Sequence, residues 1–172
     1  SAEPSRSAHL AALQARGRRE FTVVDLDYRE MFWKNEGEAR LAAHELLGSA
    51  TAAIGNREEC RVAVGETDPE RAADALLDLG LDMAVVKQGP AGTLAKTRSE
   101  RIEIPPTRVA TLNGLGAGDA FGGAFCHGLL SGWSLDRTIR AASIAGAIVA
   151  SRLECATAMP REHEILALLV RW

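Results

Sequence analysis

The sequence is poor in cysteine and in aromatic residues, and it contains no long apolar run. Its three cysteines, Cys60, Cys126 and Cys155, are widely spaced, odd in number and free of any C-x-x-C pair, which excludes a disulfide framework and a zinc knuckle. No stretch of about 18 uncharged apolar residues could span a bilayer. Residues 1–21 carry early charges in place of the apolar centre of a signal peptide. These absences predict a cytoplasmic protein with no membrane partner.

An excess of charge is also lacking, because 20 basic residues stand against 23 acidic ones and the net charge is -3. That balance offers no broad attraction for nucleic acid. What is present is ordinary for a soluble globular domain: 47% hydrophobic residues and 25% charged residues in a chain of 172. A chain of this length can bury a substantial core, so the sequence predicts one ordered domain.

The chain alternates apolar runs of strand length with segments of helical periodicity. Runs at 21–26 and 83–86 are nearly continuous, as in parallel strands covered on both faces. Residues 93–96 and 101–104 alternate more and predict exposed or antiparallel edge strands. A shorter apolar segment lies at 50–54. Helical spacing is found at 5–16, 36–47, from 69 to a stop at Gly80, and at 117–130, 135–153 and 160–169.

This order of elements predicts an α/β protein, a layered sheet with helices on both faces. Ligands of such sheets bind at the carboxyl ends of the strands.

Glycine is concentrated in one place, since seven of the sixteen glycines fall between positions 114 and 132. Residues 111–125 read TLNGLGAGDAFGGAF, and free backbone amides at a helix start beside such glycines favour anion binding. The segment lacks the lysine of a P-loop and the third glycine of G-x-G-x-x-G. Asp119 would repel a phosphate unless it serves as the base for an attacking hydroxyl. The alternative is a favourable first-turn acid beside a tight turn.

This segment resembles the C-terminal signature of the PfkB, or ribokinase-like, family of sugar kinases, D-T-x-G-A-G-D-x-F. The match covers Gly116, Ala117, Gly118, Asp119 and Phe121. The resemblance implies an ATP-dependent kinase with a ribokinase-like fold, in which Asp119 is the catalytic base. It also implies that the amides of Gly116, Ala117 and Gly118 stabilise the transferring phosphoryl group.

Further segments resemble other parts of the same family. Asn56 to Glu59 looks like its N-x-x-E element, which implies that Asn56 and Glu59 help to hold Mg²⁺; the alternative is a plain polar helix start. KQGPAG at 87–92 looks like its nucleotide turn, which implies nucleotide contacts from Lys87, Gly89 and Gly92, whereas by itself it would be an ordinary hairpin. Two more positions, in an Ala-rich segment that also suits a buried helix, fall where relatives shape the adenine pocket: Ser143 and Gly146.

The segment DLDYREMFW at 25–33 is similar to D-x-N-x-R-x-x-x-W of family members that phosphorylate keto-deoxy sugar acids. The similarity implies that Arg29 contacts the substrate or the transferring phosphate; the alternative is a surface arginine beside Asp27. Together with RLECATAMP at 152–160 and the glycine-rich segment, it implies 5-dehydro-2-deoxygluconate, an intermediate of inositol catabolism, as substrate. A kinase for another keto-deoxy sugar acid, such as 2-keto-3-deoxygluconate, stays open.

Two departures from the family pattern qualify these expectations. Asn113 stands where many relatives have an aspartate tied to a monovalent-cation site, and Glu154 stands where ribokinases often have glycine, so potassium dependence stays open. The resemblance covers only the C-terminal half of a family member, the portion that binds nucleotide and carries the base, without the N-terminal half and the lid. We therefore expect exposed apolar surface that drives self-association or homo-oligomer formation, and a non-catalytic nucleotide-binding fragment remains the alternative function.

Overall fold

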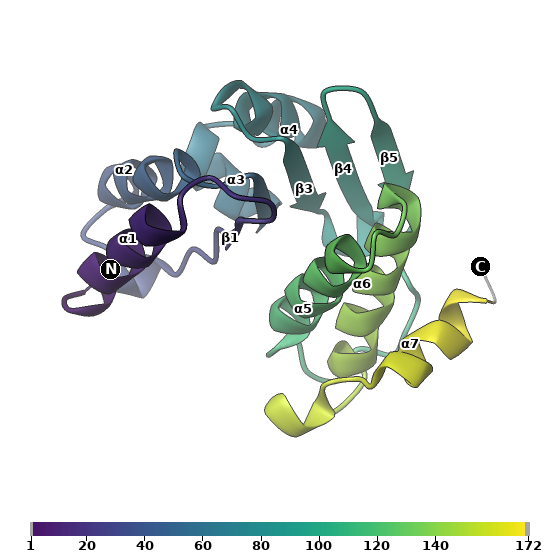
Figure 1. Cartoon of the computed structure of the whole chain (residues 1–172). Coiled ribbons are helices and arrows are strands. Elements are labelled where there is room, and N and C mark those ends of the chain that lie inside the picture. Colours follow the sequence, from purple (N-terminus) through teal and green to yellow (C-terminus); the bar gives the residue numbers. More distant parts are fainter. Residues whose placement is uncertain (1, 171–172) are drawn as a thin grey trace. The chain divides into compact units, whose positions relative to one another are not determined.

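A computed structural model describes residues 2–170 of the chain (Figure 1). The Cα positions group into two compact units. The first unit contains the chain up to Gln88 together with Leu94–Arg101. The second unit contains Gly89–Thr93 and the chain from Ile102 onward.

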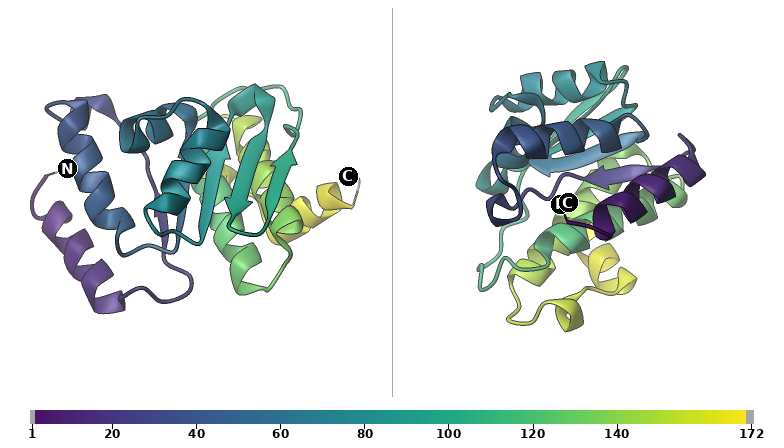
Figure 2. Two further views of the ribbon diagram at one scale, coloured as in Figure 1. Left: turned by 90° about the horizontal axis from the view of Figure 1, so that it is seen from above. Right: turned by 90° about the vertical axis from the view of Figure 1, so that its left-hand side faces the viewer.

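The first unit is built on parallel strands: β1 (Val23–Asp25), β2 (Ala52–Asn56) and β3 (Met83–Lys87). The register aligns Asp25 with Ile54 and Asn56 with Lys87, so the carboxyl ends of the three strands lie at one edge. The sheet continues with β4 (Thr93–Thr97) and β5 (Arg101–Ile104), in the order β1-β2-β3-β4-β5 (Figure 2, left). The links from β3 to β4 and from β4 to β5 are too short for parallel crossovers and make these pairs antiparallel.

Three helices of the first unit, at 36–47, 57–64 and 69–78, begin at side chains that accept hydrogen bonds from backbone amides of the first turn, whereas the helix at 5–16 has no such cap. Asn35 Oδ1 accepts the N–H of Glu38, and Asp68 Oδ1 accepts the N–H of Arg71, both at normal hydrogen-bond distance. Behind these caps, small and branched apolar side chains fill a core with β2 and β3 that includes Leu47, Leu76, Leu81 and Val86. The elements are α1 (Ser5–Arg16), the short 3-10 helix η1 (Glu30–Phe32), α2 (Glu36–Leu47), α3 (Arg57–Val64) and α4 (Pro69–Asp78).

The second unit is dominated by two helices that pack closely through small residues, α5 (Ala117–Leu130) and α6 (Leu135–Ala150). A Cβ on Gly128 would lie 2.7 Å from Thr138 Cγ2, so only glycine lets the helices approach at that point. Ser134 Oγ caps α6 by accepting the N–H of Arg137. The remaining elements are η2 (Gly89–Ala91), η3 (Ala156–Ala158) and α7 (Glu162–Leu169).

Several predicted boundaries differ from the structure. The run at 21–26 yields only the three residues of β1, because Phe21 is exposed and the Thr22 N–H bonds the side chain of Thr51. The helix predicted to end at 153 ends at Ala150, where the chain turns into η3, and the helix predicted from 160 begins at Glu162. The prediction of an exposed edge at 93–96 is wrong, since Thr93–Ala95 are buried and β4 lies between β3 and β5.

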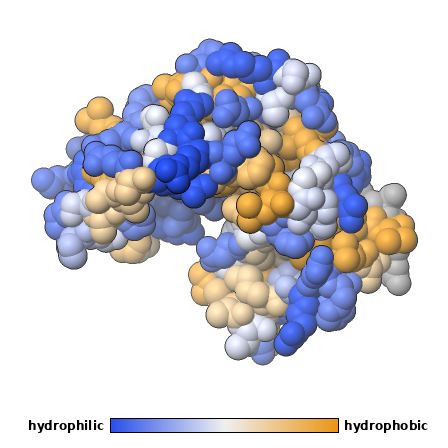
Figure 3. Space-filling view, viewed as in Figure 1, coloured by the Kyte–Doolittle hydropathy of each residue, from blue (hydrophilic) through white to orange (hydrophobic). Residues whose placement is uncertain are grey.

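The surface mixes charged and apolar side chains (Figure 3). Within residues 2–170, no helix is both long and apolar enough to cross a membrane. Large apolar side chains are nevertheless exposed on both units: Met31, Phe32 and Leu41 on the first, and Leu112, Leu115, Leu130 and Leu153 on the second.

Candidate functional site

Three polar side chains end the three parallel strands of the first unit: Asp25 on β1, Asn56 on β2 and Lys87 on β3. The Lys87 ammonium lies 3.7 Å from Asp25 Oδ1 and 3.9 Å from Glu59 Oε2. The Lys87 side chain is mostly buried, with 19% of its surface exposed. The structure therefore brings together the predicted Asn56, Glu59 and Lys87, and it adds Asp25 to them.

Asn56 and Glu59 hold each other in a reciprocal cap at the start of α3. Asn56 Oδ1 accepts the Glu59 N–H at 2.9 Å, and Glu59 Oε2 accepts the Asn56 N–H at 2.6 Å. Burial raises the pKa of the Glu59 carboxyl, against the opposing effects of the Asn56 hydrogen bond and of Lys87. A polar helix start is thus present, but its carboxylate is buried beside a lysine, unlike that of a solvated cap.

Arg29 lies outside this cluster. Its guanidinium lies 2.7 Å from Asp27, and both side chains are more than half exposed. This pairing is the one expected of a surface arginine beside Asp27.

The predicted nucleotide turn belongs to the second unit. Gly89 and Gly92 have φ values of 57° and 99°, and the Gly92 N–H donates to the Gly89 carbonyl at 3.0 Å. A Cβ on Gly92 would overlap the carbonyl oxygen of Ile104, so the turn requires glycine there for both conformation and space.

The glycine-rich segment forms the N-terminus of α5. Gly116 is the N-cap residue, with a φ of 83°, and no side chain caps this helix. A Cβ on Gly116 would lie 2.7 Å from Cys155 Sγ. The Ala117 N–H makes a long bond of 3.3 Å to the Gly114 carbonyl, and Asp119 is exposed in the first turn. An uncapped helix start with an exposed carboxylate combines anion-binding dipoles with a base.

The two predicted adenine-pocket residues lie on α6. A Cβ on Gly146 would lie 3.1 Å from the Ala117 carbonyl oxygen, so Gly146 allows α6 to pack against the first turn of α5. Ser143 Oγ is buried and has no hydrogen-bond partner among the described residues. The hydroxyls of Thr107 and Thr138 are likewise buried without a partner among the described residues, and any of the three could bond a polar ligand atom.

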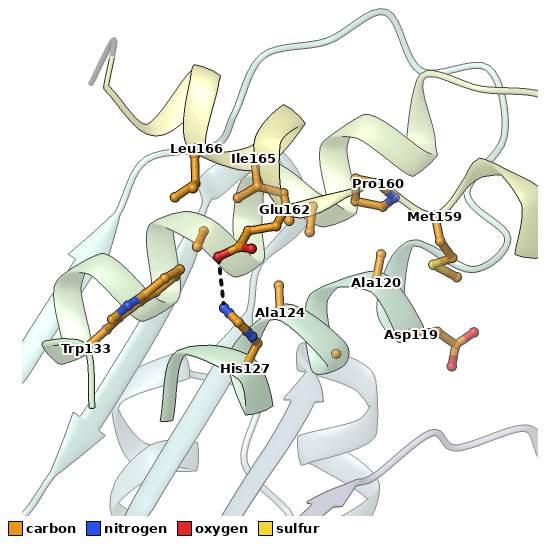
Figure 4. Close-up of a pocket in the computed structure, with 13 residues that line it drawn as sticks. Asp119, Ala120, Ala124, His127, Trp133, Met159, Pro160, Glu162, Ile165 and Leu166 are labelled. Carbon is orange, nitrogen blue, oxygen red and sulfur yellow. Dashed lines mark ion pairs between the residues drawn. The ribbon is translucent and has the colours of Figure 1, made fainter. Parts of the chain in front are cut away.

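A cavity of about 290 Å³ lies in the second unit between α5, α6 and the start of α7 (Figure 4). Asp119 lies at one end of it, and His127 and Glu162 approach to 3.5 Å at the other. The wall is mostly apolar and includes Trp133, whose ring meets His127 edge-on. This cavity could not be predicted from the sequence, because its alanines and glycines are also the residues of close helix packing.

Asp25 is the residue of the first cluster to which the sequence analysis gave no role. A usable signal exists, because Asp25 directly follows the half-buried apolar pair Val23–Val24 and so ends a strand, as Asn56 and Lys87 do. Behind the cluster, Cys60 is fully buried, and burial raises its pKa to about 12. Gly55 is equally constrained, since a Cβ there would lie 2.6 Å from Leu26 Cδ1.

Residues 2–162 match the model of the pfkB family carbohydrate kinases, and the chain belongs to this family. Among curated proteins, it is 34% identical over 169 residues to the 5-dehydro-2-deoxygluconokinase of Clostridium perfringens, covering 94% of this chain and 50% of the relative. The chain thus spans about half the length of the curated relatives it matches.

Solved structures agree on the fold. The aminoimidazole riboside kinase of Salmonella enterica, in complex with aminoimidazole riboside and an ATP analogue, has a TM-score of 0.84 and 26% identity, covering 97% of this chain and 58% of its own. The fructokinase of Vibrio cholerae, bound to fructose, ADP and calcium ion, has a TM-score of 0.84 and 25% identity, covering 97% of this chain and 56% of its own. The predicted ribokinase-like α/β fold class is confirmed.

Proposed function

We propose that this protein is an ATP-dependent carbohydrate kinase that transfers the γ-phosphoryl group of ATP to a primary hydroxyl of a sugar acid. The uncapped N-terminus of α5, with Asp119 exposed in its first turn, carries the proposal. Membership of a carbohydrate kinase family supports it. In a pure phosphate binder, a carboxylate at that place would repel the phosphate.

Asp119 acts as the base and accepts the proton of the attacking hydroxyl as the new O–P bond forms and the bond to ADP breaks. The backbone amides of Gly116, Ala117 and Gly118 face the charge of the transferring phosphoryl group. Because these donors are fixed by the helix start, they require no reorganisation during the reaction.

The cluster of the first unit serves the nucleotide and its metal. Lys87 supplies a mostly buried positive charge for phosphate oxygens. Mg²⁺ keeps several water ligands and binds through one or two carboxylates plus phosphates, and the single carboxylate of Glu59, held by Asn56, fits that demand. Within residues 2–170 no group of three acidic, histidine or cysteine side chains could hold a metal by itself. When bound, the metal neutralises charge on the phosphates.

The other predicted residues take the roles that the family resemblance implies. Gly89, Gly92, Ser143 and Gly146 contact the nucleotide, and the orphaned Ser143 hydroxyl supports this assignment. Arg29 contacts the sugar acid or the transferring phosphate and must leave Asp27 to do so. As a domain, the 172 residues are the nucleotide-binding and base-bearing portion of the kinase, and the free cysteines suit a cytoplasmic location.

We propose 5-dehydro-2-deoxy-D-gluconate as the acceptor, supported by the identity to relatives of that specificity. The test measures ADP release by the full-length protein with this acid, with 2-keto-3-deoxygluconate and with no sugar. ATP and Mg²⁺ are titrated by calorimetry in parallel.

We expect ADP release that depends on 5-dehydro-2-deoxygluconate. Faster release with 2-keto-3-deoxygluconate would reassign the substrate within the kinase class. ATP binding without sugar-dependent release from either acid would favour the non-catalytic nucleotide-binding alternative. Failure to bind ATP would contradict both.

A further inference from the structure

The loop before α5 is fastened to the end of α6 through Asn113. Its side-chain Nδ2 donates to the Leu153 carbonyl at 2.9 Å, and its Oδ1 accepts the Leu115 N–H at 3.0 Å. The backbone N–H groups of Leu112 and Asn113 both donate to the Ala150 carbonyl, at 2.8 and 3.1 Å. Both ends of the amide side chain are therefore used, one as donor and one as acceptor.

The Nδ2 donor of Asn113 determines whether this junction can bind a cation. An aspartate at position 113 could accept the Leu115 N–H in the same way, but it would place a carboxylate oxygen against the Leu153 carbonyl oxygen with no proton between them. Two oxygens at that distance repel each other unless a cation lies between them, and hard cations are bound by carboxylate and carbonyl oxygens. In this chain the N–H of an amide stands where such a cation would.

We infer that Asn113 is a positioning residue whose amide replaces a monovalent cation at the loop before α5, so that the protein needs no potassium. The N–H donor of Asn113 does not fit the monovalent cation that relatives with an aspartate at this position bind. Through residues 113–116, the junction fixes where α5 begins and hence where its first amides and Asp119 lie. The consequence for catalysis rests on the proposed function, but the absence of a cation requirement does not.

The test compares thermal unfolding of the full chain in potassium, sodium and tetramethylammonium chloride at equal ionic strength. The unaltered protein should have one midpoint in all three salts. Asn113→Asp should lower the midpoint in tetramethylammonium by about 2–4 °C, the shift expected for one lost hydrogen bond in a chain of this size. Potassium should restore it. Asn35→Asp is the matched control, because Asn35 also caps through Oδ1 but its Nδ2 donates no hydrogen bond to residues 2–170, so no salt-specific shift is expected.

Potassium-specific stabilisation of the unaltered protein would overturn the inference without any variant. So would an Asn113→Asp protein whose midpoint is the same in all three salts. If sugar-dependent ADP release is found, it should be equally fast in potassium and tetramethylammonium, and become potassium-dependent in Asn113→Asp. If no sugar acid supports release, the proposed function fails while the unfolding result still decides the role of Asn113.

Discussion

The two units present the groups of the candidate site in opposite ways. In the first, Asn56, Glu59 and Lys87 are side chains that hold one another, with a buried carboxylate, a reciprocal cap and two ion pairs. In the second, the corresponding groups are backbone amides at a helix start that no side chain caps, next to an exposed aspartate. Side chains that satisfy each other are sensitive to loss of a partner, whereas a backbone site is sensitive to anything that fills the space that glycine leaves open.

The largest expected effect distinguishes the role of Asp119 as a base from its contribution to the shape of the loop in the second unit. If the proposed function holds, Asp119→Asn should lower turnover of the full-length protein by about 10²–10⁴-fold and leave ATP affinity nearly intact, because the amide keeps the shape of the loop but accepts no proton. Steady-state kinetics and calorimetry measure the two quantities. The control is Asp136→Asn, which changes another first-turn acid, paired with Arg140 on α6. Near-normal turnover of Asp119→Asn would remove its role as base.

The next prediction tests whether Gly116 is required because a Cβ there has no room, or only because its φ is positive. Gly116 and Gly132 both have positive φ, so alanine strains each of them by about 1–2 kcal/mol. A Cβ at Gly132 meets nothing within 4 Å, whereas at Gly116 it meets Cys155 Sγ. Gly116→Ala should therefore lower the free energy of unfolding by about 1–3 kcal/mol more than Gly132→Ala in urea titrations.

Adding Cys155→Ala to Gly116→Ala removes the sulfur that the new Cβ meets. The double variant should recover most of the difference from Gly132→Ala. If the two single variants lost the same free energy of unfolding, close packing at Gly116 would have no influence on stability.

A third prediction examines the buried carboxylate of the first unit through pH. Because burial raises the pKa of Glu59, the folded protein holds that proton more tightly than the unfolded chain. Stability from this group is therefore complete below the ordinary value of 4.5 and is lost as pH rises from there through the raised pKa. Relative to the wild type, Glu59→Gln should gain stability across that window. If the group also serves the metal, Glu59→Gln should raise the Mg²⁺ concentration needed for activity.

Glu58 provides the control with the opposite sign. Its hydrogen bond from Arg61 lowers the pKa of Glu58, so its contribution is present above 4.5 and is lost as pH falls. Glu58→Gln should therefore lose stability relative to the wild type as pH rises through the lowered pKa of Glu58 toward 4.5. If pH changed the stability of both variants in the same direction relative to the wild type, Glu59 would not be the carboxyl whose pKa is raised by burial.

The smallest effect concerns glycines of α5 that have no packing role. Gly123 meets nothing within 4 Å, so Gly123→Ala should stabilise the protein by about 0.5–1 kcal/mol through helix propensity. Gly128→Ala on the same helix should destabilise it, because the new Cβ would overlap Thr138. Thermal unfolding of the two variants measures both signs, and two shifts in the same direction would refute the distinction.

Much of the fold was predictable where the signals are local. The bounds of α2 and α5 were predicted correctly, because caps and glycines stand next to the helices that they delimit. Helix α3 was expected only as the alternative to a metal-binding element, since its eight residues follow β2 without a turn and its outer face is polar. The first strand was overestimated, because an apolar run does not reveal which of its residues find a partner strand.

The candidate site divides in the same way. The grouping of Asn56 with Glu59 could be anticipated, because a cap and its partner are three residues apart. The ion pair between Asp25 and Lys87 could not, since it depends on the relative register of β1, β2 and β3. Nor could the orphaned hydroxyl of Ser143, which is defined by what surrounds a side chain in space.

The burial of Cys60 has a practical consequence, because thiolate is the form that reacts with alkylating reagents. A thiol that is fully buried and has a pKa of about 12 is inert until the first unit opens. Cys126 and Cys155 belong to the second unit and are only half-buried. Alkylation followed by peptide mass analysis during a denaturant titration would therefore record the opening of the first unit at Cys60, while the half-buried thiols of the second unit provide a reference for reaction without opening.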